Sequence, residues 1–173
     1  MEFINRETEL EFLEREYEKN KASFIPIYGR RRIGKTALIQ KFVENKKDII
    51  YYFATEQEEI LQIEELKNQI LKIIPNELLS SQKFTNWGGF FNFLSHIWPM
   101  EKKIIFAIDE VTYIIKNSKA FSSILQKFWD EFLSRSNTIF ILSGSMQSLM
   151  LEEILSYSAP LYGRRSGQIH LKE

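Results

Sequence analysis

The chain has 173 residues, with 23 Lys and Arg balanced by 23 Asp and Glu, and it contains no cysteine. This length predicts one domain over 1–173, able to bury about 70 % of its unfolded surface. Balanced charge excludes a global attraction to nucleic acid, and the lack of cysteine excludes disulfides and thiol catalysis. The polar start at 1–7 does not resemble a signal peptide, and there is no long apolar run. We therefore expect a cytoplasmic protein that does not enter a membrane.

The amino-terminal part of the chain alternates between helical and extended patterns. Apolar residues at three- and four-residue spacing predict an amphipathic helix over 7–20. The apolar run 22–28 predicts a buried parallel strand, although Pro26 within it lacks the N–H that a strand ladder uses. A second helical pattern covers 37–43. Strand and helix thus flank the segment between 28 and 37.

That segment, 29–36, reads G-R-R-R-I-G-K-T and matches the phosphate-binding pattern G-x-x-x-x-G-K-[ST]. Glycines at both ends of the turn let backbone N–H groups wrap a polyphosphate. Lys35 is placed to bind the β- and γ-phosphates, and Thr36 opens the helix as a ligand for Mg²⁺. We predict a nucleotide-binding loop rather than an ordinary basic turn, formed by Gly29, Arg30, Arg31, Arg32, Ile33, Gly34, Lys35 and Thr36. The arginine side chains are expected to face solvent, an acidic partner or the edge of the nucleotide.

Residues 45–48 read N-K-K-D, a pattern by which GTPases recognise guanine. Here the pattern ends the first helix after the loop, away from the strand tips where a base-recognising loop must lie. Lysines also suit a helix C-terminus, because they interact favourably with its dipole. Further on, 48–54 predicts a second strand, and 58–74 predicts a helix that Pro75 ends.

Two more helices are predicted over 90–97 and 120–135. The first is rich in aromatic side chains, which could form either a platform for base stacking or part of the core. Core packing is favoured, because large aromatic residues dominate protein interiors. The aromatic group comprises Trp87, Phe90, Phe91, Phe93 and Trp98.

An apolar strand predicted over 103–108 ends in Asp109 and Glu110. Ligands of open α/β sheets bind at such strand tips. Asp109 is placed to hold Mg²⁺ through its water shell, and Glu110 to polarise the water that attacks a γ-phosphate. A carboxylate directly after the magnesium aspartate is typical of ATPases that carry their own base, so ATP is expected. Alone, the pair could also simply end a strand.

A third polar group, Ser143-Gly144-Ser145, follows a strand predicted over 138–142. If this strand lies between the strands that carry the loop and the acids, Ser143 would contact the γ-phosphate or the attacking water. The alternative is a serine N-cap for a helix over 146–155, a role that fits Ser145.

Arg164 and Arg165 precede the last predicted strand, 167–171. They could stabilise charge on the nucleotide, in this chain or in a neighbouring subunit, as arginine fingers do in phosphoryl transfer. They could equally be a solvated pair at the sheet edge. The five predicted strands alternate with helices, and right-handed crossovers then give an α/β fold, a mainly parallel sheet with helices on both faces.

These motifs together resemble the archaeal-type ATPases, which are P-loop proteins of the AAA+/STAND group in prokaryotes. The resemblance covers nearly the whole chain and is carried by 3–10, 27–36, 107–110, 142–145 and 160–165. It implies the three-layer P-loop NTPase fold with sheet order 5-1-4-3-2, ATP as ligand, and Asn5 and Arg6 near the adenine. Longer relatives continue into a helical lid and a winged-helix region, which are absent here, so nucleic acid is expected as a partner only through such parts.

Two functions compete. The first is Mg²⁺-dependent hydrolysis of ATP to ADP, with Glu110 as base, Lys35 as electrostatic stabiliser, and Ser143 and Arg164 assisting. The second is a nucleotide-gated switch with negligible turnover, in which ATP or ADP orders a surface for a protein partner or for self-association. A nucleotide kinase is less favoured, because no acceptor site or arginine-rich lid is present in the sequence.

Overall fold

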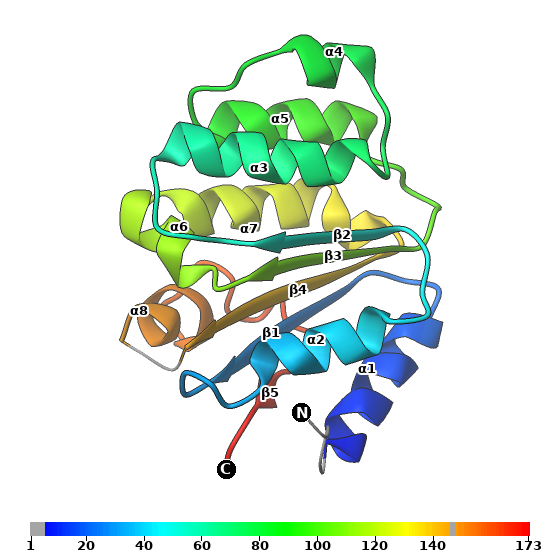
Figure 1. Ribbon diagram of the computed structural model, residues 1–173, viewed down its shortest axis with the longest axis vertical. Coiled ribbons are helices and arrows are strands. Elements are labelled where there is room, and N and C mark those ends of the chain that lie inside the picture. The colour runs from blue at the N-terminus through cyan, green and yellow to red at the C-terminus, as the bar shows by residue number, and fades with distance from the viewer. Residues whose placement is uncertain (1–5, 146–147) are drawn as a thin grey trace.

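The computed structural model describes residues 6–145 and 148–173, which form a parallel sheet between two layers of helices (Figure 1). In chain order the elements are α1 (Glu7–Glu18), β1 (Ser23–Gly29), α2 (Lys35–Val43), β2 (Ile49–Phe53), α3 (Glu59–Leu71), α4 (Glu77–Ser81), α5 (Trp87–Ile97), β3 (Ile104–Asp109), α6 (Thr112–Asn117), α7 (Phe121–Glu131), the 3-10 turn η1 (Leu133–Arg135), β4 (Thr138–Ser145), α8 (Ser148–Met150), the π-helical turn η2 (Leu151–Leu155) and β5 (Ile169–His170).

The strand order is β2-β3-β4-β1-β5, and every described pairing is parallel. The α/β class and the expected order 5-1-4-3-2 are therefore confirmed. Strand β4 lies between β1 and β3, the arrangement on which the prediction for Ser143 depends. Helices α1 and α2 pack on one face of the sheet, and α3, α5, α6, α7 and α8 contribute to the core on the other face (Figure 1).

Strand β1 is central in this sheet despite Pro26. The N–H and C=O of Phe24 both bond to Ser166, at 3.1 and 2.8 Å, on the side of β5. Residues two apart in a strand direct their polar groups to the same side, so the ring nitrogen of Pro26 also faces that side. Strand β5 pairs only with Ile27 and Tyr28. Pro26 thus lacks its N–H on the side of β1 where β5 does not pair with it, and the pairing of β1 with β4 is intact.

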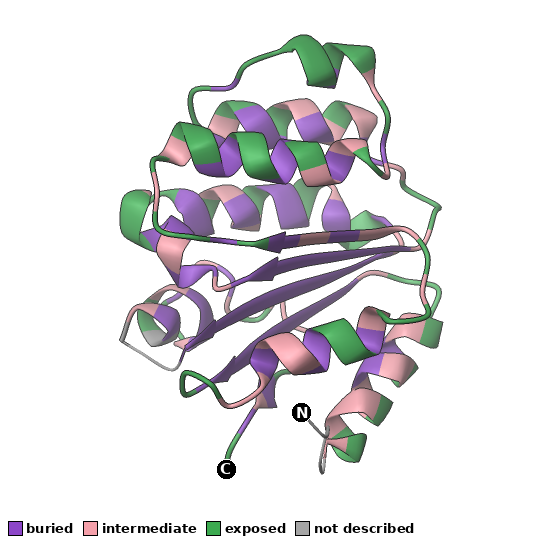
Figure 2. Ribbon diagram, viewed as in Figure 1, coloured by how far each residue is buried: buried purple, intermediate pink, exposed green. Residues whose placement is uncertain are grey.

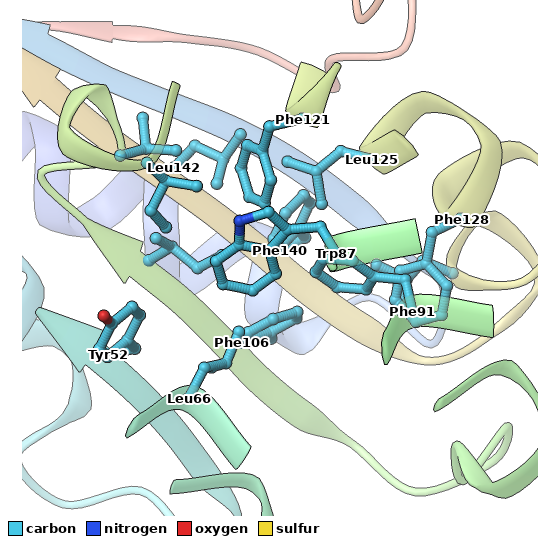
Figure 3. Packing of buried hydrophobic residues seen from close by; sticks show 14 of the residues in the cluster. Tyr52, Leu66, Trp87, Phe91, Phe106, Phe121, Leu125, Phe128, Phe140 and Leu142 are labelled. Carbon is cyan, nitrogen blue, oxygen red and sulfur yellow. The ribbon is translucent and has the colours of Figure 1, made fainter. Parts of the chain in front are cut away.

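The strands of the sheet centre are buried from end to end, as expected for parallel strands covered on both faces (Figure 2). In the larger core, Phe106 of β3 lies 5.1 Å from Phe140 of β4 between ring centroids. Aromatic side chains from helices, including Trp87 and Phe121, lie in the same cluster as this pair (Figure 3). The prediction that the aromatic group belongs to the core is confirmed, because Trp87, Phe90, Phe91 and Trp98 are buried and Phe93 packs against them.

The predicted helices need correction at their ends. Helix α5 begins at Trp87, before the predicted range 90–97, because the Asn86 side chain accepts a hydrogen bond from the Gly89 N–H at 2.8 Å. The predicted helix 120–135 is divided into α7 and η1, since the backbone leaves the helical region between them. Helices α4 and α6 are too short to give a periodic pattern, so the sequence does not predict them.

Strand β4 is longer than the predicted 138–142. It continues to Ser145, because its last residues pair with β1 as far as Gly29. Ser145 therefore ends a strand, and its role as the cap of a following helix stays a prediction, because an N-cap residue is itself extended and the next residues are not described. Of the helix predicted over 146–155, residues 146–147 lie outside the described part of the chain, and α8 and η2 follow from Ser148 onward. Strand β5, by contrast, is shorter than the predicted 167–171.

Among the described residues, no helix has both the length and the apolar character needed to cross a bilayer.

The aromatic core leads to a first test. Phe106→Ala removes a fully buried ring that contacts Phe140 and Trp98, and we expect the free energy of unfolding to fall by about 3–5 kcal/mol. The matched control is Phe53→Ala on edge strand β2, where the ring is 44 % exposed and the change should be within about 0.5 kcal/mol. Urea denaturation measures both. Equal losses for the two variants would contradict this account of the core.

Candidate functional site

The candidate site lies at the edge of the sheet where β1, β3 and β4 end. The register pairs Gly29 with Ser145 and Ile108 with Leu142, so the last residues of these three strands are neighbours. The loop 29–36 joins β1 to α2 at this edge. The structure thus brings the predicted phosphate loop, the acidic pair and the serines together. In open α/β sheets, ligands bind at this edge.

Both glycines of the loop have backbone conformations that other residues avoid. Gly29 has φ 155°, and a Cβ there would lie 2.6 Å from the carbonyl oxygen of Leu171. Gly34 has φ 101°, and a Cβ there would meet no atom within 4 Å. The first glycine is needed for close packing, whereas the second borders open space at the start of α2. Such space at a helix N-terminus suits an anion.

Lys35 is turned inward and closes the loop on itself. Its Nζ donates to the carbonyl oxygens of Gly29 at 3.0 Å and Arg30 at 2.8 Å, and the residue is only 4 % exposed. Burial lowers the pKa of this ammonium, and the nearby carboxylates of Glu110 and Asp109 act against that shift. The two carbonyls hold the charge at the inner side of the loop, where a bound phosphate would compete for it.

Asp109 is the most heavily bonded side chain of the site. Thr36 Oγ1 donates to Asp109 Oδ2 at 2.7 Å, and the Ser143 hydroxyl donates to Oδ1. The Tyr51 hydroxyl also donates to Oδ2, at 2.6 Å. The sequence analysis missed Tyr51, which lies in the middle of β2. Four elements, β2, β3, β4 and α2, therefore meet at one buried carboxylate.

Glu110 follows Asp109 with φ 57°, a left-handed conformation that is uncommon for a residue with a side chain. Its N–H donates to Ser143 Oγ at 3.2 Å. Burial raises the pKa of the Glu110 carboxyl, Lys35 opposes this rise, and the charge of Asp109 adds to it. The residue borders a hollow of about 320 Å³ next to the loop, which gives water access to it.

The two serines of β4 differ in how their hydroxyls are used. Ser143 donates to Asp109 and accepts from the Glu110 N–H, so its hydroxyl serves the acidic pair. Ser145 is 4 % exposed, and its Oγ has no hydrogen-bond partner within the described ranges. Ser145 pairs with Gly29, the first residue of the loop. The register that places Ser145 there depends on the full length of β4, which the sequence pattern underestimates.

Three of the remaining loop residues, Arg30, Arg31 and Ile33, bond to neighbours. Arg30 pairs with Glu173 at 3.2 Å, with both side chains 81 % exposed, so this ion pair contributes little to stability. Arg31 donates to the Tyr113 hydroxyl at 3.1 Å. Arg32 is exposed and has φ 62°. The carbonyl oxygen of Ile33 accepts from Arg6 at 3.4 Å.

Arg6 links the loop to the carboxyl-terminal segment. Its guanidinium donates to the carbonyl oxygen of Lys172 at 2.7 Å as well as to Ile33. Beside this link is an open hollow of about 410 Å³, bordered by Ile33 and His170. That Arg6 lies near the adenine stays a prediction from the resemblance. Asn5, the other residue named for it, lies outside the described residues.

The structure does not bring Arg164 to the phosphate loop. Its guanidinium forms a bidentate pair with Asp130 of α7, at 3.2 and 3.1 Å. Two residues later Ser166 bonds to Phe24, near the start of β1, and Gly29 is five residues further along that strand, about 16 Å away. Arg165 donates to the carbonyl oxygen of Leu155. A finger role for Arg164 would therefore have to act on a neighbouring molecule.

The donor set of the site fits Mg²⁺ bound together with phosphates. Within the described ranges, no group of three or more His, Cys, Asp or Glu residues could hold a metal alone. Thr36 and Asp109 supply one hydroxyl and one carboxylate, 2.7 Å apart, next to the open space at Gly34. Mg²⁺ commonly takes one or two protein oxygens and completes its shell with waters and substrate phosphates. Thr36 and Asp109 are the residues that would hold it.

Comparisons with solved structures agree with this fold. The Walker-type ATPase Paby2304 of Pyrococcus abyssi aligns with a TM-score of 0.64 and 26 % identity, over 98 % of this chain and 54 % of that one. Cdc6p from Pyrobaculum aerophilum aligns with a TM-score of 0.63 and 14 % identity, over 97 % and 45 % of the two chains. At that identity, the second match concerns the fold alone.

Sequence relatives lead to the same family. An uncharacterised protein of Methanocaldococcus jannaschii is 38 % identical over 98 % of this chain, which spans only 36 % of that protein. An uncharacterised ATP-binding protein of the same organism is 67 % identical over 26 % of this chain and 76 % of its own length. The family model of an ATPase domain predominantly from Archaea matches residues 3–173. This chain therefore belongs to that family of archaeal ATPase domains.

Proposed function

We propose that this domain binds ATP with Mg²⁺ at the edge of the sheet and hydrolyses it to ADP and phosphate. The observation that carries the proposal is the convergence on Asp109 of Thr36 from the phosphate loop and Ser143 from β4. Membership of an ATPase family supports nucleotide binding. Hydrolysis is the further step, for which Glu110 is the residue of interest.

In this proposal Lys35 releases the carbonyls of Gly29 and Arg30 and binds the β- and γ-phosphates. Its ammonium then stabilises the negative charge that develops on the transferred phosphoryl group. Thr36 and Asp109 hold Mg²⁺, which supplies neutralising charge to the phosphate oxygens when bound. The geometry of the closed loop supports this order of events, because the Lys35 ammonium is already next to the space that the phosphates would enter.

Glu110 is proposed as the general base. A water attacks the γ-phosphorus, its proton passes to the Glu110 carboxylate, and the bond between the γ-phosphorus and the bridging oxygen breaks as ADP leaves. A base with a raised pKa accepts a proton more readily than an ordinary glutamate. The left-handed backbone conformation at Glu110 and the hydrogen bond from its N–H to Ser143 fix the position of the Glu110 Cα, from which the side chain extends.

ATP is favoured over GTP by the position of residues 45–48. Lys46 is bonded to Glu14 and to the carbonyl oxygen of Phe42, and Asp48 is paired with Lys102. Asp48 directly precedes β2, at the amino end of the strands, and so lies at the edge opposite to the loop. Guanine recognition from there is not feasible.

A nucleotide-gated switch remains the second candidate. The chain spans 36 % of the curated relative that it matches over most of its length, so the activity of the whole protein can depend on other parts. One solved neighbour is described as Drosophila ORC bound to DNA, and this structural likeness concerns the fold alone. Under the switch proposal, ATP occupancy would order a surface for a protein partner.

Phosphate release separates these two functions. We expect Mg²⁺-dependent release by wild type and a fall of about 10²–10⁴-fold in Glu110→Gln, while ATP affinity stays within a few-fold. Glu56→Gln is the matched control, because this exposed carboxylate borders the same hollow as Glu110. If wild type releases phosphate only at background rate, and Glu110→Gln leaves both that rate and ATP binding unchanged, the switch is the better description.

The raised pKa of Glu110 leads to a stability test. In the unfolded chain the Glu110 carboxyl has a pKa of about 4.3, and in the folded protein its pKa is higher. The folded state therefore binds more protons between these two pKa values, and the free energy of unfolding falls as pH rises from one to the other. Glu110→Gln carries no charge and escapes this loss. We expect the stability of the variant relative to wild type to increase as pH rises above about 4, where the unfolded carboxyl begins to lose its proton, and urea denaturation over a pH series measures this difference. A gap independent of pH would contradict the expected burial effect.

Ser145 is proposed to contact the γ-phosphate, because its buried hydroxyl has no described partner and borders the loop. Ser145→Ala should lower turnover by roughly 10- to 100-fold, as expected for a hydrogen bond to a charged group, and leave ADP affinity unchanged. Ser122→Ala is the control, since that hydroxyl in α7 is equally buried and also has no described partner. Equal effects of the two variants on turnover would argue against this contact.

A further inference from the structure

Tyr51 reaches the acidic pair from the edge strand of the sheet. In the register of β2 and β3, Tyr51 pairs with Ala107, and Asp109 lies two residues further along β3. This is a diagonal cross-strand relation on one face, a distance that a tyrosine side chain can span. The Tyr51 hydroxyl donates to Asp109 Oδ2 at 2.6 Å, a short bond typical of a hydroxyl and a carboxylate.

The bonds at Asp109 leave the carboxylate little freedom. An ionised carboxylate offers about four acceptor positions. Thr36 and Tyr51 both donate to Oδ2, and Ser143 donates to Oδ1. One acceptor position, on Oδ1, then remains for a water of a metal shell or for the metal itself. Tyr51 completes the bonding of Oδ2 and thereby determines which oxygen is available.

The Tyr51 phenol is a permanent donor at this position. A tyrosine phenol has one O–H donor, and here that donor is directed at Asp109 Oδ2. Ser143 and Thr36 are donors to the same carboxylate from β4 and α2, whereas Tyr51 donates from β2, the edge strand of the sheet.

Tyr52, the next residue, provides an internal comparison. It faces the other side of the sheet, where its hydroxyl donates to Glu65 of α3 at 3.0 Å. Figure 3 shows its ring with the residues of the large core. The two tyrosines thus have the same chemistry and the same acceptor type, and only one of them bonds to the acid of the site.

We propose that Tyr51 is a positioning residue for the magnesium site: its hydroxyl holds the Asp109 carboxylate in the orientation that presents Oδ1 to the metal shell. This inference rests on the proposed function, since it assumes that Asp109 holds Mg²⁺. Substitution of a residue that orients a metal ligand in this way commonly lowers metal affinity by about 10- to 100-fold.

The test is a calorimetric titration of ATP into wild type, Tyr51→Phe and Tyr52→Phe, at Mg²⁺ concentrations from none, with EDTA, to saturation. We expect Tyr51→Phe to need roughly 10- to 100-fold more Mg²⁺ than wild type for the same gain in ATP affinity. Its ATP affinity in EDTA should equal that of wild type. Tyr52→Phe, which loses a hydroxyl away from the loop, should follow wild type throughout.

Steady-state hydrolysis adds a second readout. In Tyr51→Phe the Mg²⁺ concentration for half-maximal rate should rise by the same factor, while the rate at saturating Mg²⁺ approaches that of wild type. A variant that is only less well folded would instead lose ATP affinity in EDTA and maximal rate together, and that result overturns the inference. So does a Mg²⁺ dependence of Tyr51→Phe equal to that of wild type.

Asp109→Asn distinguishes failure of this inference from failure of the proposed function. If wild type gains ATP affinity with Mg²⁺ and Asp109→Asn does not, the metal site stands, and the result for Tyr51→Phe decides the positioning role alone. If wild type itself is indifferent to Mg²⁺, the proposed metal site fails, and the role of Tyr51 fails with it.

Discussion

The structure depends on one buried carboxylate, that of Asp109, which binds four elements of the fold to one another. It accepts hydrogen bonds from α2, β2 and β4, and it ends β3. A charge in this position is costly to bury unless it is well bonded, and three donors meet that condition. The same bonds fix the relative positions of the phosphate loop and the strand tips. Stability of the sheet edge and arrangement of the site are therefore two results of the same contacts.

Around this carboxylate the protein keeps groups that do not favour folding. Glu110 has a left-handed backbone and a raised pKa, Lys35 is buried with a lowered pKa, and Ser145 has a hydroxyl without a described partner. Such local costs are tolerated when the surroundings are rigid, and they gather at functional sites. Here the rigid surroundings are the buried strands and the aromatic core behind them. The sheet thus allows a strained and charged edge.

The sequence was sufficient for the class of fold and for residues whose role is local. The phosphate loop and the acidic pair are contiguous patterns, and the strand order followed from the resemblance to archaeal ATPases. Tyr51 could not be found in this way, because its contact with Asp109 crosses two strands. The position of Ser145 opposite Gly29 was not predicted, because β4 is three residues longer than its apolar run. The position of Arg164 depends on its pairing with Asp130, which no local pattern contains.

Arg6 has a mechanical consequence for this domain. A single guanidinium joins the start of α1, the loop carbonyl of Ile33 and the backbone at Lys172. Leu171, next to that last point, also packs its carbonyl oxygen against Gly29. A displacement of the segment after β5 would therefore be transmitted to the loop at two points, Gly29 and Ile33. The position of this segment and the shape of the loop are mechanically coupled.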